Sequence, residues 1–182
     1  EITYLCGYEE HIHNLSCYSD DTADLETAAV WEASLPGQLT GQWSNDLVLV
    51  AETQIGFGES EKNYILAEDG ETKHGITRYG QWYGNPYGDW SAMFLTFCLN
   101  YADVPQEAIP WSPGVYNMMR LAEDAGILTL PDTDAGSTGN ILFLDTDDNG
   151  NADKALIVTA MNDGSITAVG GDWNNSVAEV YL

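Results

Sequence analysis

Positive charge is scarce in this sequence. Its 182 residues hold five Lys and Arg against 29 Asp and Glu, which gives a formal net charge of -24 at pH 7. Such a chain repels phosphate backbones and anionic lipid headgroups, so nucleic acids and anionic membranes are poor partners. The same balance disfavours phosphate-rich wall polymers and favours basic protein surfaces or neutral glycans. The five cations are Lys62, Lys73, Arg78, Arg120 and Lys154.

Long apolar runs are also absent. A membrane-spanning helix needs about 20 consecutive apolar residues, and no segment of this chain offers them, so we expect no membrane insertion. The first residues lack the pattern of a secretory leader, and we therefore expect a soluble piece of a larger surface protein. With 44% hydrophobic residues, the chain can bury one core and a small appendage.

Cysteine is limited to three residues, and two of them lie in a short clip, residues 1–18. Cys6, His11, His13 and Cys17 offer two thiolates and two imidazoles, a full tetrahedral set for zinc. A disulfide between Cys6 and Cys17 is the alternative, as in many extracellular proteins, but it leaves both histidines without a role. We favour zinc. The clip resembles the Cys-Gly-x-Glu-Glu-His-x-His units repeated in large surface proteins of gut Firmicutes.

Apolar periodicity predicts helices first and strands afterwards. Residues 19–45 form an acidic lead-in with a short helix, and its Trp and Leu residues predict that it packs on the main domain, residues 46–182. Ser44 and Asn45 are candidate caps for the first helix of that domain. This order of elements indicates an α+β fold. The helices are expected near 47–55, 90–101 and 113–125, and the strands near 141–144, 155–160, 166–169 and 178–182, with a hairpin turn at 162–164.

Residues 88–98 are the most informative segment. They begin Gly-Asp-Trp-Ser-Ala-Met-Phe and continue as an apolar run that ends in Cys98. The segment resembles the start of the catalytic helix in the CHAP family (cysteine, histidine-dependent amidohydrolases and peptidases), where the pattern is Asp-Trp-Cys-Ala-Met-Phe. Ser91 stands at the position of the nucleophilic Cys. A thiol beside an imidazole ionises readily, whereas a hydroxyl needs a well-placed base.

Further motifs extend the resemblance over roughly the last three quarters of the chain. Residues 50–57 are similar to the family's opening helix and Gln-x-Gly turn, and 77–84 to its Tyr-Gly-x-Trp-Tyr-Gly element. Residues 139–145 are similar to its Gly-Asp-Ile-x-Phe-Phe strand. The resemblance implies a papain-like CHAP fold, with three helices packed on a short antiparallel sheet.

The same alignment of motifs places Lys154 at the position of the general-base His, and Asp172 at the third polar position, which is usually Asn. Ser91, Lys154 and Asp172 therefore all depart from the family pattern, and we expect no catalysis. A Ser91 and Lys154 dyad is one alternative, which requires a neutral lysine with a pKa far below ~10.4. A peptidoglycan amidase or endopeptidase whose Cys was changed to Ser91 is the other. His74 is expected to be a solvated loop residue.

Residues 145–153 place carboxylates and carboxamides at alternate positions, with Gly at the sixth. This pattern resembles the calcium loop of an EF-hand, although Leu156 replaces the bidentate Glu at the twelfth position. An acidic hairpin without an ion is the alternative. We favour calcium, because so many clustered carboxylates repel one another without a cation. The expected ligands are side-chain oxygens of Asp145, Asp147, Asn149 and Asp153 and the backbone carbonyl of Asn151.

Aromatic residues are frequent in the segments that border the groove implied by the resemblance. Such rings hold sugars and peptides by stacking and apolar contact. Tyr83, Trp111 and Trp173 are the expected ligand-binding residues, and the last two are flanked by polar or turn residues, so we expect them to be exposed.

These features together predict a non-catalytic CHAP-like binding module at a bacterial cell surface. Its expected partner is a host protein, such as an immunoglobulin or a mucosal glycoprotein, or a cell-wall peptide or glycan.

Overall fold

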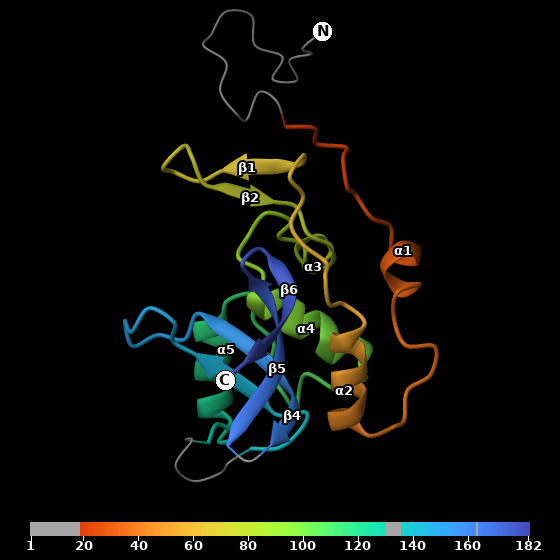
Figure 1. The fold of residues 1–182 in the computed structure, drawn as a ribbon, viewed down its shortest axis with the longest axis vertical. Coiled ribbons are helices and arrows are strands. Elements are labelled where there is room, and N and C mark those ends of the chain that lie inside the picture. Colours follow the sequence, from red (N-terminus) through yellow and green to blue (C-terminus); the bar gives the residue numbers. More distant parts are fainter. Residues whose placement is uncertain (1–18, 130–135, 163) are drawn as a thin grey trace, which may run out of the picture.

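The computed structural model of the chain describes residues 19–129, 136–162 and 164–182 (Figure 1). These residues form five helices and two antiparallel sheets, which confirms the α+β class. In chain order the elements are α1 (Ala28–Glu32), α2 (Trp43–Glu52), β1 (Tyr64–Leu66), β2 (Lys73–Gly75), α3 (Arg78–Tyr83), α4 (Ser91–Tyr101), α5 (Val115–Asp124), β3 (Ile141–Leu144), β4 (Lys154–Asn162), β5 (Ser165–Trp173) and β6 (Ser176–Tyr181).

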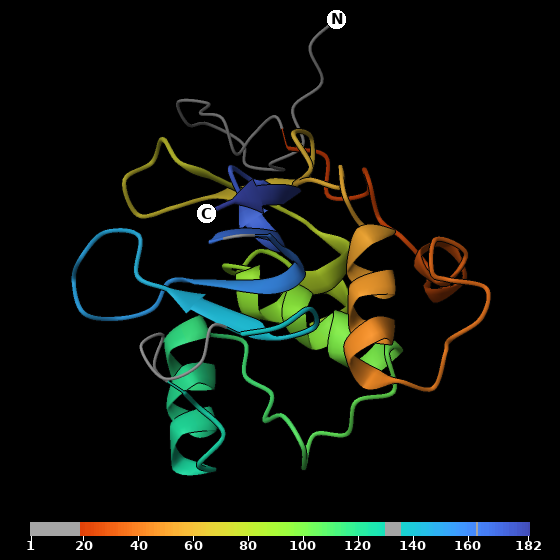
Figure 2. The same cartoon turned by 60° about the horizontal axis from the view of Figure 1, so that its bottom comes forward.

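The larger sheet has the order β3-β4-β5-β6, so each strand pairs with its neighbour in sequence. It packs against α4, while α2 and α5 lie on opposite sides of that helix (Figure 2). The β4 and β5 strands are each nine residues long, longer than the sequence predicts. They extend to the exposed Asn162 and Ser165 at the hairpin end, and β5 also continues through the buried Gly170 and Gly171 to Trp173.

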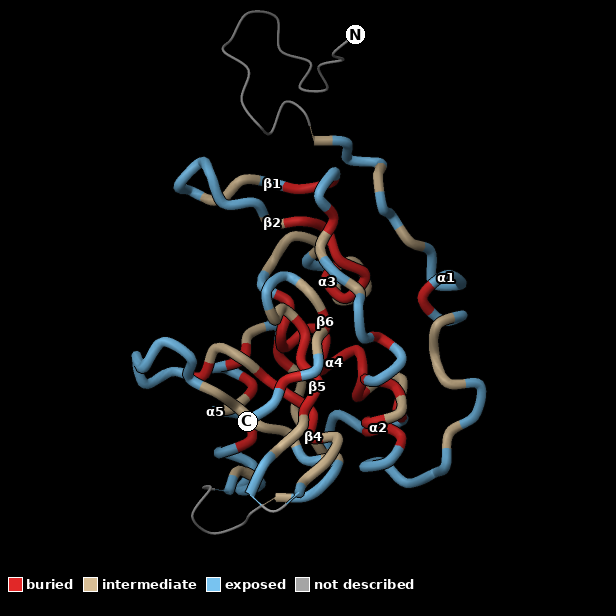
Figure 3. The backbone as a smooth tube through the Cα atoms, in the orientation of Figure 1, coloured by how far each residue is buried: buried red, intermediate tan, exposed pale blue. Residues whose placement is uncertain are grey.

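Helix α4 is the centre of the core, as its nearly continuous apolar sequence predicts. Residues 91–99 are all buried, and the tube in Figure 3 is red along this helix and the strands that face it. The helix approaches β5 closely because that strand carries Gly171. A Cβ atom at Gly171 would lie 2.4 Å from Cβ of Phe94, so any larger residue would force helix and sheet apart.

Three elements were not predicted from the sequence. β1 and β2 form a separate hairpin, and His74 lies half-buried in β2 rather than in a solvated loop. Helix α3 is short and contains Gly80, a poor helix former. The Thr77 hydroxyl stabilises its start by accepting a hydrogen bond from the Gly80 N–H at 3.0 Å. Its end is set by Gly84, which takes the left-handed conformation with φ 90°.

The lead-in runs along one side of the molecule, from the β1–β2 hairpin past α1 to α2 (Figure 1). Asp20 N–H donates to the Lys62 carbonyl at 2.8 Å, and Trp31 of α1 is buried in the main core. None of the described helices is long and apolar enough to cross a membrane.

Candidate functional site

Ser91 begins α4 and is 2% exposed. Its Oγ accepts a hydrogen bond from the backbone N–H of Ala155 in β4 at 3.0 Å. The residue borders a cavity of about 290 Å³, which is also lined by Asp89, Asp153 and the start of α5. The hydroxyl therefore lies beside a cavity, but its contact is with a backbone N–H donor and not with a base.

Lys154 begins β4 and turns toward the end of β5. Its Nζ donates to the Asp172 carbonyl at 2.6 Å and to Asp172 Oδ2 at 3.1 Å. Both side chains are largely buried, at 23% and 16% exposed. The amine acts as a donor in both contacts, which is the role of an ammonium ion in a salt bridge and not that of a general base.

Asp172 is the most perturbed carboxyl of this site. Burial raises its pKa above the usual range, and the adjacent Lys154 opposes that rise. The Asp89 carboxylate raises the pKa further, whereas His74 lowers it. His74 thus belongs to the electrostatic surroundings of the site, a role that its isolated position in the sequence did not indicate.

The structure therefore brings Ser91 close to β4 through Ala155 and joins Lys154 to Asp172. Cys98 lies further along α4, is fully enclosed, and is the free cysteine of the described residues. Burial raises the pKa of its thiol well above the ordinary value, so Cys98 does not supply the thiolate that Ser91 lacks.

The three aromatic candidates belong to two different clusters. Tyr83 and Trp111 both contact Trp82, with ring centroids 6.2 Å and 6.3 Å from its ring respectively. Trp173 instead packs against a second apolar cluster around Leu156 in the sheet. All three are partly buried, so the expected exposure of Trp111 and Trp173 is wrong. The Trp111 indole N–H is enclosed and has no partner within the described residues.

The acidic loop between β3 and β4 gathers its carboxylates. One oxygen each from Asp145, Asp147 and Asp153 lies within 4.8 Å of the others, and calcium ligands at about 2.4 Å from an ion span a similar distance. Asp145 Oδ2 accepts the Gly150 N–H at 2.7 Å, which lowers the Asp145 pKa. Asn149 Oδ1 accepts from the Asn151 N–H at 2.8 Å. The donor set fits a hard cation such as calcium.

The expected zinc ligands Cys6, His11, His13 and Cys17 lie outside the described residues.

A buried polar network around Arg78 was not predicted. Arg78 Nη2 donates to Glu26 Oε1 at 2.8 Å, and Nη1 donates to Ser34 Oγ and Gln54 Oε1. The guanidinium also stacks on the Phe57 ring, 3.4 Å from its centroid. The sequence signal was the presence of one of only five cations next to the aromatic Tyr79 and two residues after the apolar Ile76.

Comparisons with protein-family models, with curated proteins and with solved structures find no significant match to this chain. The functional argument therefore depends on the geometry of the chain itself.

Proposed function

We propose that this chain is a CHAP-like module of papain-like architecture that binds a ligand and does not hydrolyse it. The arrangement that supports the proposal is a buried helix whose first residue, Ser91, meets the strand that carries Lys154, with Asp172 on the next strand. These are the three positions at which the sequence motifs place a nucleophile, a base and an orienting residue.

The proposal that the chain is not catalytic rests on the pairing of Lys154 with Asp172. A general base must lie within hydrogen-bond reach of the proton that it removes. Lys154 Nζ instead donates to two oxygen atoms of Asp172, and the Ser91 hydroxyl oxygen is held by a backbone N–H. This arrangement stabilises the β4–β5 pair, and within the described residues no base is found in hydrogen-bond contact with the Ser91 hydroxyl.

The charge of the chain guides the proposal for the partner. At -24 it attracts basic protein surfaces and tolerates neutral glycans. We propose a host protein, such as an immunoglobulin or a mucosal glycoprotein, or a cell-wall peptide, met at a bacterial cell surface by a larger protein that contains this module. Tyr83, Trp111 and Trp173 are the proposed ligand contacts.

Hydrolysis of purified wall fragments, measured as release of new amines, tests the proposal. The unchanged chain and Ser91→Cys should both give no turnover. A cationic Lys154 does not protonate a leaving amine efficiently near neutral pH, and the thiol gains no imidazole partner. The double variant Ser91→Cys with Lys154→His is the matched comparison, because it restores both family residues. Turnover by the unchanged chain or by Ser91→Cys alone would overturn the proposal in favour of a hydrolase.

A further inference from the structure

The last strand of the larger sheet has an edge that is only partly covered. β6 pairs with β5 on one side, and no further strand of the described chain follows it in the order β3-β4-β5-β6. The outer side of such a strand carries backbone N–H and C=O groups, which can pair with an extended segment of another chain.

The register shows which groups point away from the sheet. Ile166 N–H donates to the Leu182 carbonyl and Leu182 N–H donates to the Ile166 carbonyl, both at 2.9 Å, so these two residues form a hydrogen-bonded pair. In an antiparallel ladder such pairs alternate with pairs that exchange no hydrogen bonds. Tyr181 and Glu179 fall in pairs of the second kind. Their N–H and C=O groups therefore point away from β5.

The first part of this edge already holds an extended segment. The Val177 N–H donates to the Phe57 carbonyl at 2.6 Å, and the Val177 carbonyl accepts the Gly56 N–H at 2.9 Å. Because Val177 has the same parity as Glu179 and Tyr181, this contact confirms the direction of their backbone groups. Within the described residues, no backbone group bonds to the outward N–H and C=O groups of Glu179 and Tyr181.

The side chains along the uncovered part of β6 are of two kinds. Tyr181 is 75% exposed, and its hydroxyl donates to the exposed Glu179 carboxylate. Side chains alternate between the two faces of a strand, so Val180 lies on the opposite face, where it belongs to an apolar cluster with Leu156. An added strand would therefore meet a carboxylate on one face and apolar side chains on the other.

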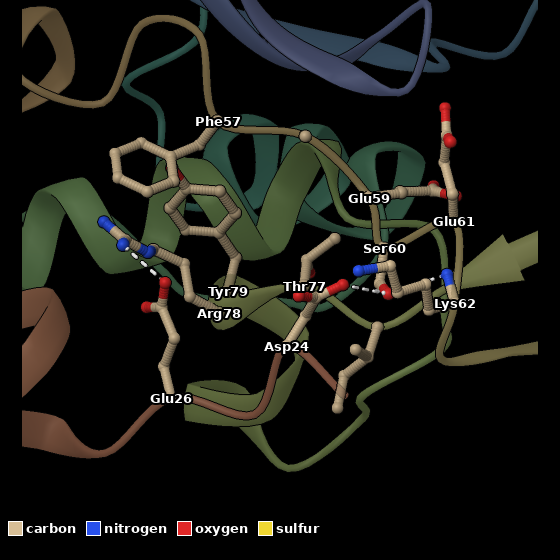
Figure 4. Close-up of a pocket in the computed structure, with 12 residues that line it drawn as sticks. Asp24, Glu26, Phe57, Glu59, Ser60, Glu61, Lys62, Thr77, Arg78 and Tyr79 are labelled. Carbon is tan, nitrogen blue, oxygen red and sulfur yellow. Dashed lines mark hydrogen bonds and ion pairs between the residues drawn. The ribbon is translucent and has the colours of Figure 1, made fainter. Parts of the chain in front are cut away.

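The cavity between the lead-in and the segment that precedes β1 differs from this edge (Figure 4). Its acids near the lead-in are already engaged, since Asp24 accepts from the Ser60 hydroxyl at 2.6 Å and Glu26 is paired with Arg78 at 2.8 Å. The outward backbone groups of β6 have no such partners within the described residues.

Charge decides which extended segment fits. A second copy would bring together two chains of net charge -24, and an acidic segment would be repelled in the same way. A lysine or arginine side chain opposite Glu179 forms a favourable cross-strand pair instead. Apolar, β-branched residues at the alternate positions would extend the cluster around Val180.

We propose that β6 binds an extended basic segment of a partner protein, which adds to the larger sheet as a further strand. The segment alternates basic and apolar side chains, and its backbone pairs with Glu179 and Tyr181. This site does not depend on the Ser91 region or on the aromatic contacts proposed above, so its failure would leave that function untouched.

The test is an NMR titration of the isotope-labelled chain with the acetylated and amidated peptide Lys-Val-Lys-Val-Lys-Val. We expect shifts centred on residues 178–182, and slower hydrogen exchange of the Glu179 and Tyr181 amides when the peptide is present. The same peptide methylated on every interior backbone nitrogen keeps its charge and apolar groups but cannot donate to a strand. It should not bind.

Tyr181→Pro blocks the edge and spares the ladder to β5, because proline lacks the N–H that points away from that strand. It should weaken binding about tenfold or more, since a hydrogen bond and room for the partner are lost. Tyr181→Ala is the matched control, which keeps the N–H and should weaken binding at most about threefold. Glu179→Gln should weaken it about threefold, whereas Glu107→Gln, at an exposed acid between α4 and α5, should not.

Equal binding of the methylated peptide, or no shift in residues 178–182 at millimolar peptide, would overturn the proposal. Equal affinities of Tyr181→Pro and Tyr181→Ala would also overturn it, because attraction by net charge alone would then explain the binding. A dimer in analytical ultracentrifugation that Tyr181→Pro abolishes would assign the edge to a second copy instead. Should Tyr181→Pro fail to fold, the methylated peptide still decides with the unchanged chain.

Discussion

Lys154 and Asp172 meet because of strand register. Leu156 of β4 pairs with Gly170 of β5, and continuing that antiparallel register by two residues places Lys154 opposite Asp172. The sequence motifs identified each position, but the salt bridge between them could not be predicted, since it depends on register and on side-chain direction. Lys154 therefore forms its salt bridge with the Asp172 carboxylate on the neighbouring strand. The Ser91 hydroxyl instead accepts a hydrogen bond from the backbone N–H of Ala155.

This geometry predicts a change in the Asp172 pKa. Burial already raises that pKa and the Lys154 ammonium opposes the rise, so Lys154→Met should raise it further. A carboxyl whose pKa is raised in the folded state contributes stability that is present below its unfolded pKa of about 3.9 and is lost as pH rises through the folded pKa. The variant should therefore be less stable than the unchanged chain by about 1–2 kcal/mol near neutral pH, with a smaller difference in acid.

Carbon-detected NMR titration of the Asp172 carboxyl, together with urea unfolding in acid and at neutral pH, measures both effects. Lys73→Met is the control, because Lys73 stacks on the Tyr64 ring and makes no salt bridge with Asp172. An unchanged Asp172 pKa in Lys154→Met would contradict the coupling.

Among the elements, those with strong apolar patterns were predicted and those held by local polar contacts were not. Helices α2 and α5 bury apolar residues at helical spacing, and α4 is buried along most of its length. The four strands of the larger sheet follow apolar runs, although all four residues of β3 are only half-buried. The start of α2 differed from expectation. The helix begins at Trp43, ahead of the candidate caps Ser44 and Asn45, and no side chain caps it. Asp46 in its first turn instead accepts the N–H groups of Thr40 and Gly41 at 2.6 and 2.9 Å, which fixes the preceding turn.

The β1–β2 hairpin and α3 were not predicted because these elements are short and have no clear apolar pattern. Each of the two strands is three residues long, too short for an alternating pattern to emerge. Helix α3 is six residues long and contains Gly80, so its helix propensity is weak. Its local signal was Thr77, whose side chain accepts from the Gly80 N–H at the start of the helix.

The loop between β3 and β4 gives the second prediction. We expect one calcium ion to bind there, because one carboxylate oxygen each of Asp145, Asp147 and Asp153 lies within 4.8 Å of the others. Asp147→Asn removes one charge and should weaken binding on the order of tenfold. Saturating calcium should raise the free energy of unfolding by about 2.7 kcal/mol at a hundredfold excess over Kd. Magnesium should bind more weakly, since it prefers rigid octahedral sites that keep several waters.

Isothermal titration calorimetry of the chelator-treated chain measures this binding. Asp103→Asn serves as the control for lost charge, because Asp103 is an exposed acid in a different turn, with φ 56°. Calcium binding that is as strong in Asp147→Asn as in the unchanged chain would place the ion elsewhere, and no heat at all would favour an acidic hairpin without an ion.

For the whole molecule, the question is whether the lead-in and the main domain form one cooperative unit. A chain of net charge -24 repels itself, so its parts stay together only where packing and hydrogen bonds exceed that repulsion. The lead-in supplies both. Trp31 is 8% exposed and joins the main core, and its indole N–H donates to the Tyr101 hydroxyl at the end of α4 at 2.8 Å. The salt bridge between Glu26 of the lead-in and Arg78 of α3 is a second contact between the two parts.

Trp31→Ala should therefore lower the free energy of unfolding of the whole chain by about 3 kcal/mol, the cost of removing a large aromatic side chain from a core. Urea unfolding followed by far-ultraviolet circular dichroism measures it, since that signal reports helix and strand and does not depend on the lost indole.

Val30→Ala is the matched control: it lies beside Trp31 in α1, is 51% exposed, and should change stability by less than about 0.5 kcal/mol. Because α1 itself is only five residues long, it contributes little signal of its own, and a shift of the entire transition to lower urea must come from the main domain. If Trp31→Ala left that transition where it was, the lead-in would be an attachment that the stability of the main domain does not require.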